Sequence, residues 1–311
     1  MLDRNPETAK MGEEILPFEL GYLPEYFQKK AAVELSETPE RKEQSLCQIK
    51  EFLRGDKNTT GLIFDDDFLI QFLRVRKYNV AKAFSQIKSY VSLRKKNPQI
   101  FLNFSYEWIV KTLYDRTITI LPWRCQDGCT VIIVELDNWD PQTFPVDQVK
   151  KALVIYLLQS LREPMSQVNG IKAIIDVKSN PLRHVRYCTP SNLHLIYHGI
   201  QEVCPSRYKE VHIVNNSLTF KAAWYIIRPF LSDKIKKRVN FHNGTETLLN
   251  FFPKAIMPKH YGGDLENFQM WDWLKRVTTP EILATVGGVQ NWPSQNEKRR
   301  SSSASNSIII T

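Results

Sequence analysis

The sequence has no long hydrophobic run. Its longest apolar stretches, at residues 152–158 and 224–227, are far shorter than the roughly 20 residues that a membrane-spanning helix needs. The first residues show neither the apolar segment of a secretory signal nor the Arg-rich composition of a transit peptide. We therefore expect a cytoplasmic protein that meets membranes only at their surface.

Cysteine is scarce and unevenly placed. The five cysteines are odd in number and scattered, which is typical of unpaired thiols in a reducing compartment. Cys125 and Cys129 are four residues apart, but no second Cys/His pair completes a four-ligand zinc site. The helix-spaced pair His194 and His198 has no acidic third ligand nearby. The sequence therefore predicts no metal and no cofactor.

The common catalytic motifs are also missing. There is no Gly-x-Gly-x-x-Gly, no P-loop, no nucleophile elbow and no His-Glu-x-x-His. Asp176, His212 and Cys204 remain as candidates for a lipid-metabolising enzyme, but no base, orienting group and oxyanion donor occur together. Asp176 is more typical of a loop cap or an Arg partner, and Cys204 of a structural thiol. We do not expect an enzyme.

Positive charge is concentrated in one part of the chain. The formal net charge is +9, and residues 181–260 hold twelve Lys and Arg against four Asp and Glu. Such a segment favours phosphate groups of nucleic acids or of lipid headgroups. No DNA-binding motif or stacking platform accompanies these cations, so no nucleic-acid partner is predicted.

The patterns divide the chain into four parts. Residues 1–36 form a loosely ordered lead with at most one short helix. Residues 37–100 predict a small helical unit, with Thr38-Pro39 and Asn79 as helix starts and acids at 65–67 opening the helix between them. Residues 101–275 form the main domain. Residues 276–311 form an extension that ends in a disordered basic and Ser-rich tail.

The main domain alternates strands and helices. Two β-rich runs at 118–121 and 131–136 flank a Gln-Asp-Gly turn, which predicts an antiparallel hairpin. Further strands are expected at 171–177 and 211–214. Helices are expected at the following ranges: 147–161, 190–203, 218–230, 232–238 and 245–252. The fold class is therefore α/β, a mixed sheet flanked by helices.

Two of these helices, 147–161 and 218–230, are apolar on almost every side. A helix of that kind is either covered by protein all round or borders a cavity or a membrane. The packed core is the commoner explanation for one such helix. Two of them beside a basic segment also suit a lipid pocket with a mobile wall.

Five motifs occur in order along the chain, and together they resemble CRAL-TRIO (Sec14-like) lipid carriers over residues 38–275. They are Phe72-Leu73-Arg74-Val75-Arg76-Lys77-Tyr78, Asn169-Gly170-Ile171-Lys172-Ala173-Ile174-Ile175-Asp176, His212-Ile213-Val214-Asn215, Arg228-Pro229-Phe230-Leu231 and Pro258-Lys259-His260-Tyr261-Gly262-Gly263. Within the family, they are most similar to the α-tocopherol transfer and cellular retinaldehyde-binding branch. The chain departs from that branch at Ser179-Asn180-Pro181 and at Arg186.

The resemblance implies a helical unit followed by an α/β lipid-binding domain, with a gate helix at about 216–238 over an apolar cavity. It places a phosphoinositide site on Arg76, Arg207, Lys209, Lys234 and Arg238. It also places the pocket on Leu153, Leu157, Ile174, Ile196, Ile200, Phe220, Trp224, Ile227 and Leu231.

These expectations describe a monomeric carrier of one tocopherol-, retinoid- or phospholipid-like molecule, which exchanges its ligand at phosphoinositide-containing membranes of the endosomal or Golgi type. The alternative is a module that senses or presents a lipid without transferring it. The tail sequence Arg299-Arg300-Ser301-Ser302 is a candidate phosphorylation site, which would reverse the local charge.

Overall fold

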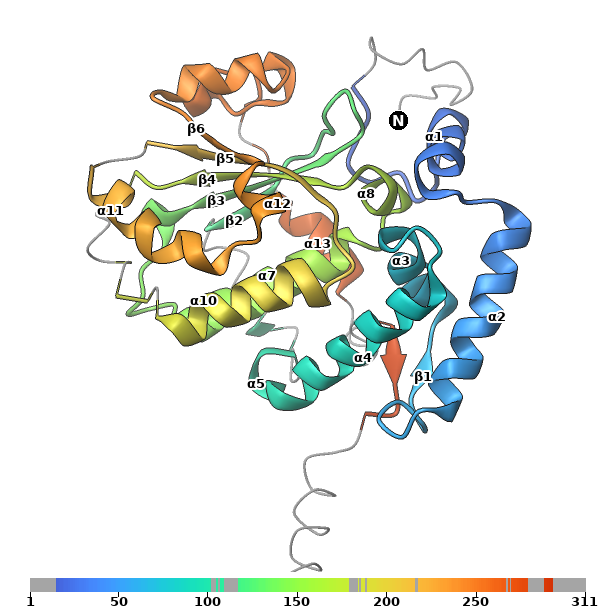
Figure 1. Ribbon diagram of the computed structural model, residues 1–311. Helices are drawn as coiled ribbons and strands as arrows, with labels where there is room; N and C mark the ends of the chain where they lie inside the picture. Colours follow the sequence, from blue (N-terminus) through green and yellow to red (C-terminus); the bar gives the residue numbers. More distant parts are fainter. Residues whose placement is uncertain are drawn as a thin grey trace, which may run out of the picture.

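The computed structural model describes residues 15–101, 105, 107–108, 117–178, 184, 186–187, 189–215, 218–266, 268, 270–278 and 288–292 (Figure 1). Within these ranges, no helix is both long enough and apolar enough to cross a bilayer. Residues 293–311, which include the basic and Ser-rich end of the predicted extension, lie outside them.

Residues 15–35 are packed against the molecule, so this part of the predicted lead is not loosely ordered. Phe18 is buried and meets the Trp273 ring edge-on, with ring centres 4.8 Å apart. Helix α1 (Glu25–Leu35) buries Phe27, Ala31 and Leu35. These three residues recur every four positions and so share one helix face, a pattern that the polar surroundings hide.

The helical unit forms as predicted. The Thr38 side chain accepts a hydrogen bond from the Arg41 N–H, and the Asn79 side chain accepts one from the Lys82 N–H, so both N-caps are occupied. The four helices of the unit are α2 (Pro39–Gly55), α3 (Asp66–Val75), α4 (Val80–Lys96) and α5 (Pro98–Phe101).

The sheet has five strands in the order β2-β3-β4-β5-β6. The predicted hairpin is confirmed, because β2 and β3 are antiparallel, whereas the other neighbours are parallel. The sheet is therefore mixed, as expected. The strands are β2 (Ile118–Ile120), β3 (Thr130–Glu135), β4 (Ile171–Asp176), β5 (Tyr208–Val214) and β6 (Val239–Phe241).

Helices cover both sides of this sheet. Figure 1 shows α7, α10 and α11 on one side and the short helices that follow β6 on the other. In chain order, the helices and turns between β3 and β6 include α7 (Val146–Ser160), α8 (Pro164–Asn169), α10 (Pro190–Tyr197), the π-helical turn η3 (His198–Val203), α11 (Leu218–Ile227), the 3-10 turn η4 (Arg228–Phe230) and α12 (Asp233–Lys236). After β6 come the 3-10 turns η5 (Thr245–Asn250), η6 (Lys254–Ile256) and η7 (Lys259–Tyr261).

The helix predicted at 245–252 is thus a 3-10 turn instead. It ends three residues before Pro253, which cannot donate a backbone hydrogen bond to a longer helix.

A short two-stranded sheet connects the helical unit with the C-terminal part of the chain. Strand β1 (Ile63–Phe64) of the helical unit pairs antiparallel with β7 (Val289–Gln290). Just beyond β7, the Trp292 ring lies against the Arg94 guanidinium, 4.1 Å from the ring centre. Part of the predicted C-terminal extension therefore belongs to the packed structure. Helix α13 (Trp271–Val277) lies between it and the sheet domain along the chain.

The two faces of the sheet differ in how well they are filled. On one face, which we call the covered face, Val131, Ile133 and Ile174 are fully buried and pack with Leu248, Phe252, Ile256 and other residues of the segment after β6. On the opposite face, which we call the open face, Val134, Ala173, Ile175 and Val211 remain half-buried although they lie on the three central strands. Apolar side chains in the middle of a sheet are left partly uncovered only where the layer above them is incomplete.

Candidate functional site

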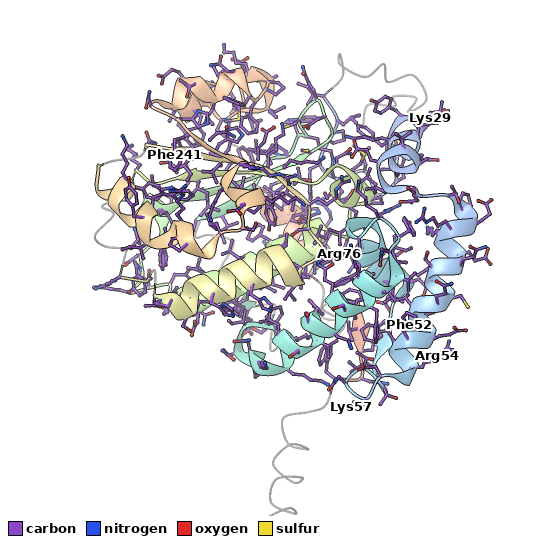
Figure 2. The ribbon with its side chains drawn as sticks, viewed as in Figure 1. Lys29, Phe52, Arg54, Lys57, Arg76 and Phe241 are labelled. Carbon is purple, nitrogen blue, oxygen red and sulfur yellow. The ribbon has the colours of Figure 1, made fainter. Side chains whose placement is uncertain are left out.

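Five cations converge at one edge of the sheet, and we call them the basic cluster: Arg76, Arg207, Lys209, Lys234 and Arg238. Because β5 and β6 are parallel neighbours, the residues that lead into them, Arg207 and Arg238, meet at the same edge. Lys234 belongs to α12, which immediately precedes β6. Arg76 comes from the end of α3 in the helical unit, near the middle of the molecule (Figure 2).

The electrostatics show how close these cations are. The pKa of Lys234 is lowered by partial burial and then by the positive charges of Arg238, Arg207, Arg76 and Lys209. The pKa of Lys209 is likewise lowered, by burial first and then by Arg207, while the Glu34 carboxylate opposes the shift. Because these cations repel one another, the cluster becomes electrostatically favourable when a bound anion neutralises part of its charge.

Part of the basic cluster is fixed in place by hydrogen bonds. Arg207 donates to the backbone carbonyl of Val168 and lies 3.1 Å from the Glu34 carboxylate. Arg238 donates to the backbone carbonyl of Tyr208 on the neighbouring strand. Lys234 has no hydrogen-bond or ion-pair partner within the part of the chain that the structure describes. The cluster therefore combines anchored guanidinium groups with an available ammonium group.

Gln86 is a positioning residue that the sequence did not reveal. Its side-chain oxygen accepts a hydrogen bond of 2.7 Å from Nε of Arg76. Its amide nitrogen donates to the backbone carbonyls of Val203 and Cys204, at 3.3 and 3.1 Å. Gln86 thereby joins Arg76 to the segment that leads into Arg207. The available signal was a polar residue among the buried positions of α4, beside Ile87.

An apolar cavity lies between the helical unit and the main domain. It has about 410 Å³ of space between the atoms, part of it open to solvent. The centres of water molecules can reach only about 30 Å³ of it, which is room for about two of them, so the walls must separate before a lipid can enter. The described lining residues are Leu93, Ile100, Phe101, Lys150, Leu153, Val154, Leu157, Leu195, Gly199 and Cys204.

Helix α11 covers the outer edge of the open face. Its Trp224 ring meets the Phe241 ring of β6 edge-on, with centres 5.1 Å apart. Two residues of the same helix point outward, since Tyr225 is 74% exposed and Ile226 is 52% exposed. α11 thus presents apolar groups both to the sheet and to the solvent, as a helix bordering a membrane or a cavity does.

The predicted pocket residues fall into three groups. Leu153 and Leu157 line the cavity, on adjacent turns of α7. Four residues on or just after α11 are half-buried, namely Phe220, Trp224, Ile227 and Leu231. Ile196 and Ile200 have side chains outside the described part of the structure.

Ile174 was placed wrongly by the sequence reasoning. It lies on the covered face, fully buried with Phe252 and Ile256, because strand side chains alternate and its neighbours Ala173 and Ile175 occupy the open face. Ala173 and Ile175 are therefore the β4 residues on the face of the sheet that α7 covers.

The candidate catalytic carboxylate, Asp176, is held in structural hydrogen bonds. One of its oxygens accepts from the Asn215 amide at 2.8 Å and from the Lys178 N–H at 2.9 Å. The other accepts from the Tyr261 hydroxyl at 2.9 Å. Tyr261 belongs to the motif that ends in Gly263, where a Cβ atom would lie 1.8 Å from the Met257 carbonyl oxygen. The motif is therefore held against the end of β4 by the hydrogen bond between Tyr261 and Asp176.

The other candidates for catalysis or metal binding also have the surroundings of residues with a structural role. Burial raises the pKa of the Cys204 thiol to about 12, which keeps it protonated and unreactive. The His194 and His198 rings stack on each other, with centres 5.5 Å apart. Across the described residues, no group of three or more His, Cys, Asp or Glu side chains could hold a metal ion.

A mixed sheet with an incompletely covered face, an apolar cavity and a converging group of cations would suit a lipid-binding protein. Comparison with known proteins agrees, because the CRAL/TRIO domain matches residues 116–263. The chain is 30% identical to the human (Homo sapiens) α-tocopherol transfer protein-like protein over 279 residues, which cover 88% of this chain and 82% of that protein.

Clavesin-1 of Rattus norvegicus is also 30% identical, over 256 residues that cover 81% of this chain and 72% of its own. The chain belongs to the CRAL/TRIO family, a family of lipid-binding and lipid-transfer proteins. The crystal structure of Sfh5 overlaps 92% of this chain and 99% of its own, with a TM-score of 0.47 and 10% identity.

Proposed function

We propose that the protein carries one hydrophobic molecule in the apolar cavity that α7 and α10 line, and exchanges it at phosphoinositide-containing membranes. The convergence of five cations around Lys234 is the observation that carries this proposal. Such a cluster is electrostatically unfavourable unless a polyanion binds it, and an inositol phosphate headgroup supplies several negative charges in a small volume.

The size of this attraction is sufficient for membrane recruitment. Each Lys or Arg near an anionic membrane surface contributes about 1 kcal/mol. Four or five such contributions, reduced by the cost of ordering the side chains, raise membrane affinity by about a thousandfold. The exposed apolar residues Tyr225 and Ile226 would add burial in the interface.

Headgroup binding and ligand exchange would be coupled through the chain itself. Lys234 and Arg238 belong to the proposed gate segment, residues 216–238, which also contains α11. A headgroup that draws these two cations toward the membrane acts on the segment that covers the open face. Within this segment η4 contacts α10, which lines the cavity, so outward movement of the segment is the proposed route of entry and release.

Two measurements test the proposal. Mass spectrometry of organic extracts from the purified protein should find a stoichiometric hydrophobe, and transfer of that hydrophobe between donor and acceptor vesicles should accelerate when the acceptors contain a phosphoinositide. A protein that is always empty and takes up nothing from liposomes would contradict the carrier. Ligand binding without any acceleration of transfer would favour a sensing or presenting role.

A further inference from the structure

The apolar cavity contains a cation in its wall. Of the described residues that line it, Lys150 alone is charged, and its side chain is only 10% exposed. Leu153, Val154 and Leu157 follow on the same face of α7, three, four and seven residues further along the helix. The Lys150 side chain therefore borders the cavity at the start of an apolar helical stripe, with its ammonium group beside Asp147.

This ammonium group has an incomplete set of partners. Its Nζ atom lies 2.7 Å from the Asp147 carboxylate, one turn earlier in α7. The Asp147 side chain is 59% exposed, so water screens its charge. A lysine ammonium has three N–H donors, and this contact uses one of them. A buried cation near the N-terminal end of a helix also opposes the helix dipole.

A second cation strengthens the positive potential at the same end of α7. The Lys151 ammonium lies over the Trp108 ring, 4.6 Å from its centre. Burial lowers the pKa of Lys151, which shows that this ammonium is also partly removed from water. Two adjacent cations at the beginning of an apolar wall favour an anion at that place.

We infer that the carried molecule is an amphiphile with a carboxylate head, which binds the Lys150 ammonium while its hydrocarbon chain lies along Leu153 and Leu157. This inference rests on the proposed carrier function and specifies the ligand class of the same cavity. The helix rises about 10 Å from Lys150 to Leu157, which gives the chain a continuous apolar track.

The test compares two ligands that differ only in the head group. Calorimetric titration of the delipidated full-length protein with dodecanoate and with dodecanol at pH 7.5 should show about tenfold tighter binding of the acid. Lys150→Met keeps the apolar stem of the side chain without its ammonium group and should remove this preference without weakening dodecanol binding. Lys150→Arg should retain it, and the neighbouring Lys151→Gln should retain most of it.

The possible failures are distinguishable. Equal binding of the acid and the alcohol by the unaltered protein overturns the carboxylate inference and leaves the carrier proposal standing. A preference for the acid that persists in a folded Lys150→Met protein also overturns the inference, because the head group then binds elsewhere. If neither ligand binds and the purified protein is empty, the carrier proposal fails as well.

Discussion

His212 and His242 meet across neighbouring strands of the covered face, with Nδ1 of His212 2.9 Å from Nε2 of His242. The contact continues at both ends, since His212 Nε2 lies 3.0 Å from the Glu210 carboxylate and His242 Nδ1 lies 2.7 Å from the Thr247 hydroxyl. The Thr247 hydroxyl also lies 2.7 Å from the Gly244 carbonyl oxygen, and its single proton can serve only one of these two contacts.

This buried chain predicts an acid-sensitive fold. Burial lowers the pKa of both histidines, and for His212 it outweighs the opposing effect of the Glu210 carboxylate. Below about pH 6.5, the unfolded state therefore binds protons that the folded state does not, and stability falls as the pH falls, by at most about 1.4 kcal/mol per pH unit for each histidine.

Urea unfolding at pH 7.5 and pH 5.5 measures the effect. The midpoint should drop at the lower pH, and His212→Gln should reduce the difference between the two values. His260, an exposed histidine beside Glu135, offers the matched control, because His260→Gln should leave the difference unchanged. Equal midpoints at both pH values in the unaltered protein would show that the histidine pair does not set the pH dependence.

Charge reversal tests the basic cluster. The double variant Lys234→Glu/Arg238→Glu should bind vesicles containing a phosphoinositide bisphosphate at least about tenfold more weakly, because two attractive contributions of about 1 kcal/mol become repulsive. Vesicle sedimentation measures this binding. The variant Lys254→Glu/Lys259→Glu changes the net charge equally, but on η6 and η7 beyond the covered face. Equal weakening by both variants would attribute binding to total charge.

Gln86 should affect both stability and headgroup binding. Gln86→Leu leaves the Arg76 guanidinium and the Val203 carbonyl without this partner, which should cost about 1–3 kcal/mol in unfolding free energy. It should also weaken phosphoinositide-vesicle binding, since Arg76 then loses one of the contacts that position its guanidinium within the basic cluster. Ile87→Val, at the next buried position, should destabilise by about 0.5–1.5 kcal/mol without changing vesicle binding. If both variants weaken vesicle binding alike, Gln86 has only a structural role.

Removing the Tyr261 hydroxyl should lower only the stability of the fold. Tyr261→Phe loses the hydrogen bond to the Asp176 carboxylate, worth about 1.5–3 kcal/mol, and keeps the ring in its buried position. Tyr225→Phe, on the exposed side of α11, should change stability by less than about 0.5 kcal/mol. Urea unfolding of both variants measures these changes in stability. Unchanged stability of Tyr261→Phe would mean that Asp176 does not need this bond.

The sequence predicted the alternation of strands and helices because each element carries its own signal. The Gln126-Asp127-Gly128 turn identifies the hairpin, and Thr38 and Asn79 occupy the caps that their positions suggested. The assignment of Ile174 failed for a physical reason. In a parallel strand buried on both faces, neighbouring residues are all apolar, so the pattern does not say which of them faces a cavity.

The basic cluster could not be found from local patterns. Its residues come from the end of α3, the start of β5 and the segment around α12, and only the family resemblance connected them. Gln86 was missed because one polar residue on a buried helix face is also common in ordinary cores. The packing of Phe18 and the β1–β7 pairing depend on contacts between distant parts of the chain, which local periodicity does not encode.

The unequal filling of the two sheet faces separates two requirements that compete in most binding proteins, a stable fold and an adaptable binding surface. The face sealed by Phe252, Ile256 and Tyr261 supplies cohesion, and residues there tolerate little change in volume. The opposite face, with Val134, Ala173 and Ile175 incompletely packed, can be remodelled at small cost in folding energy. Such a division allows substitutions beside Ala173 to alter ligand preference while the scaffold itself stays intact.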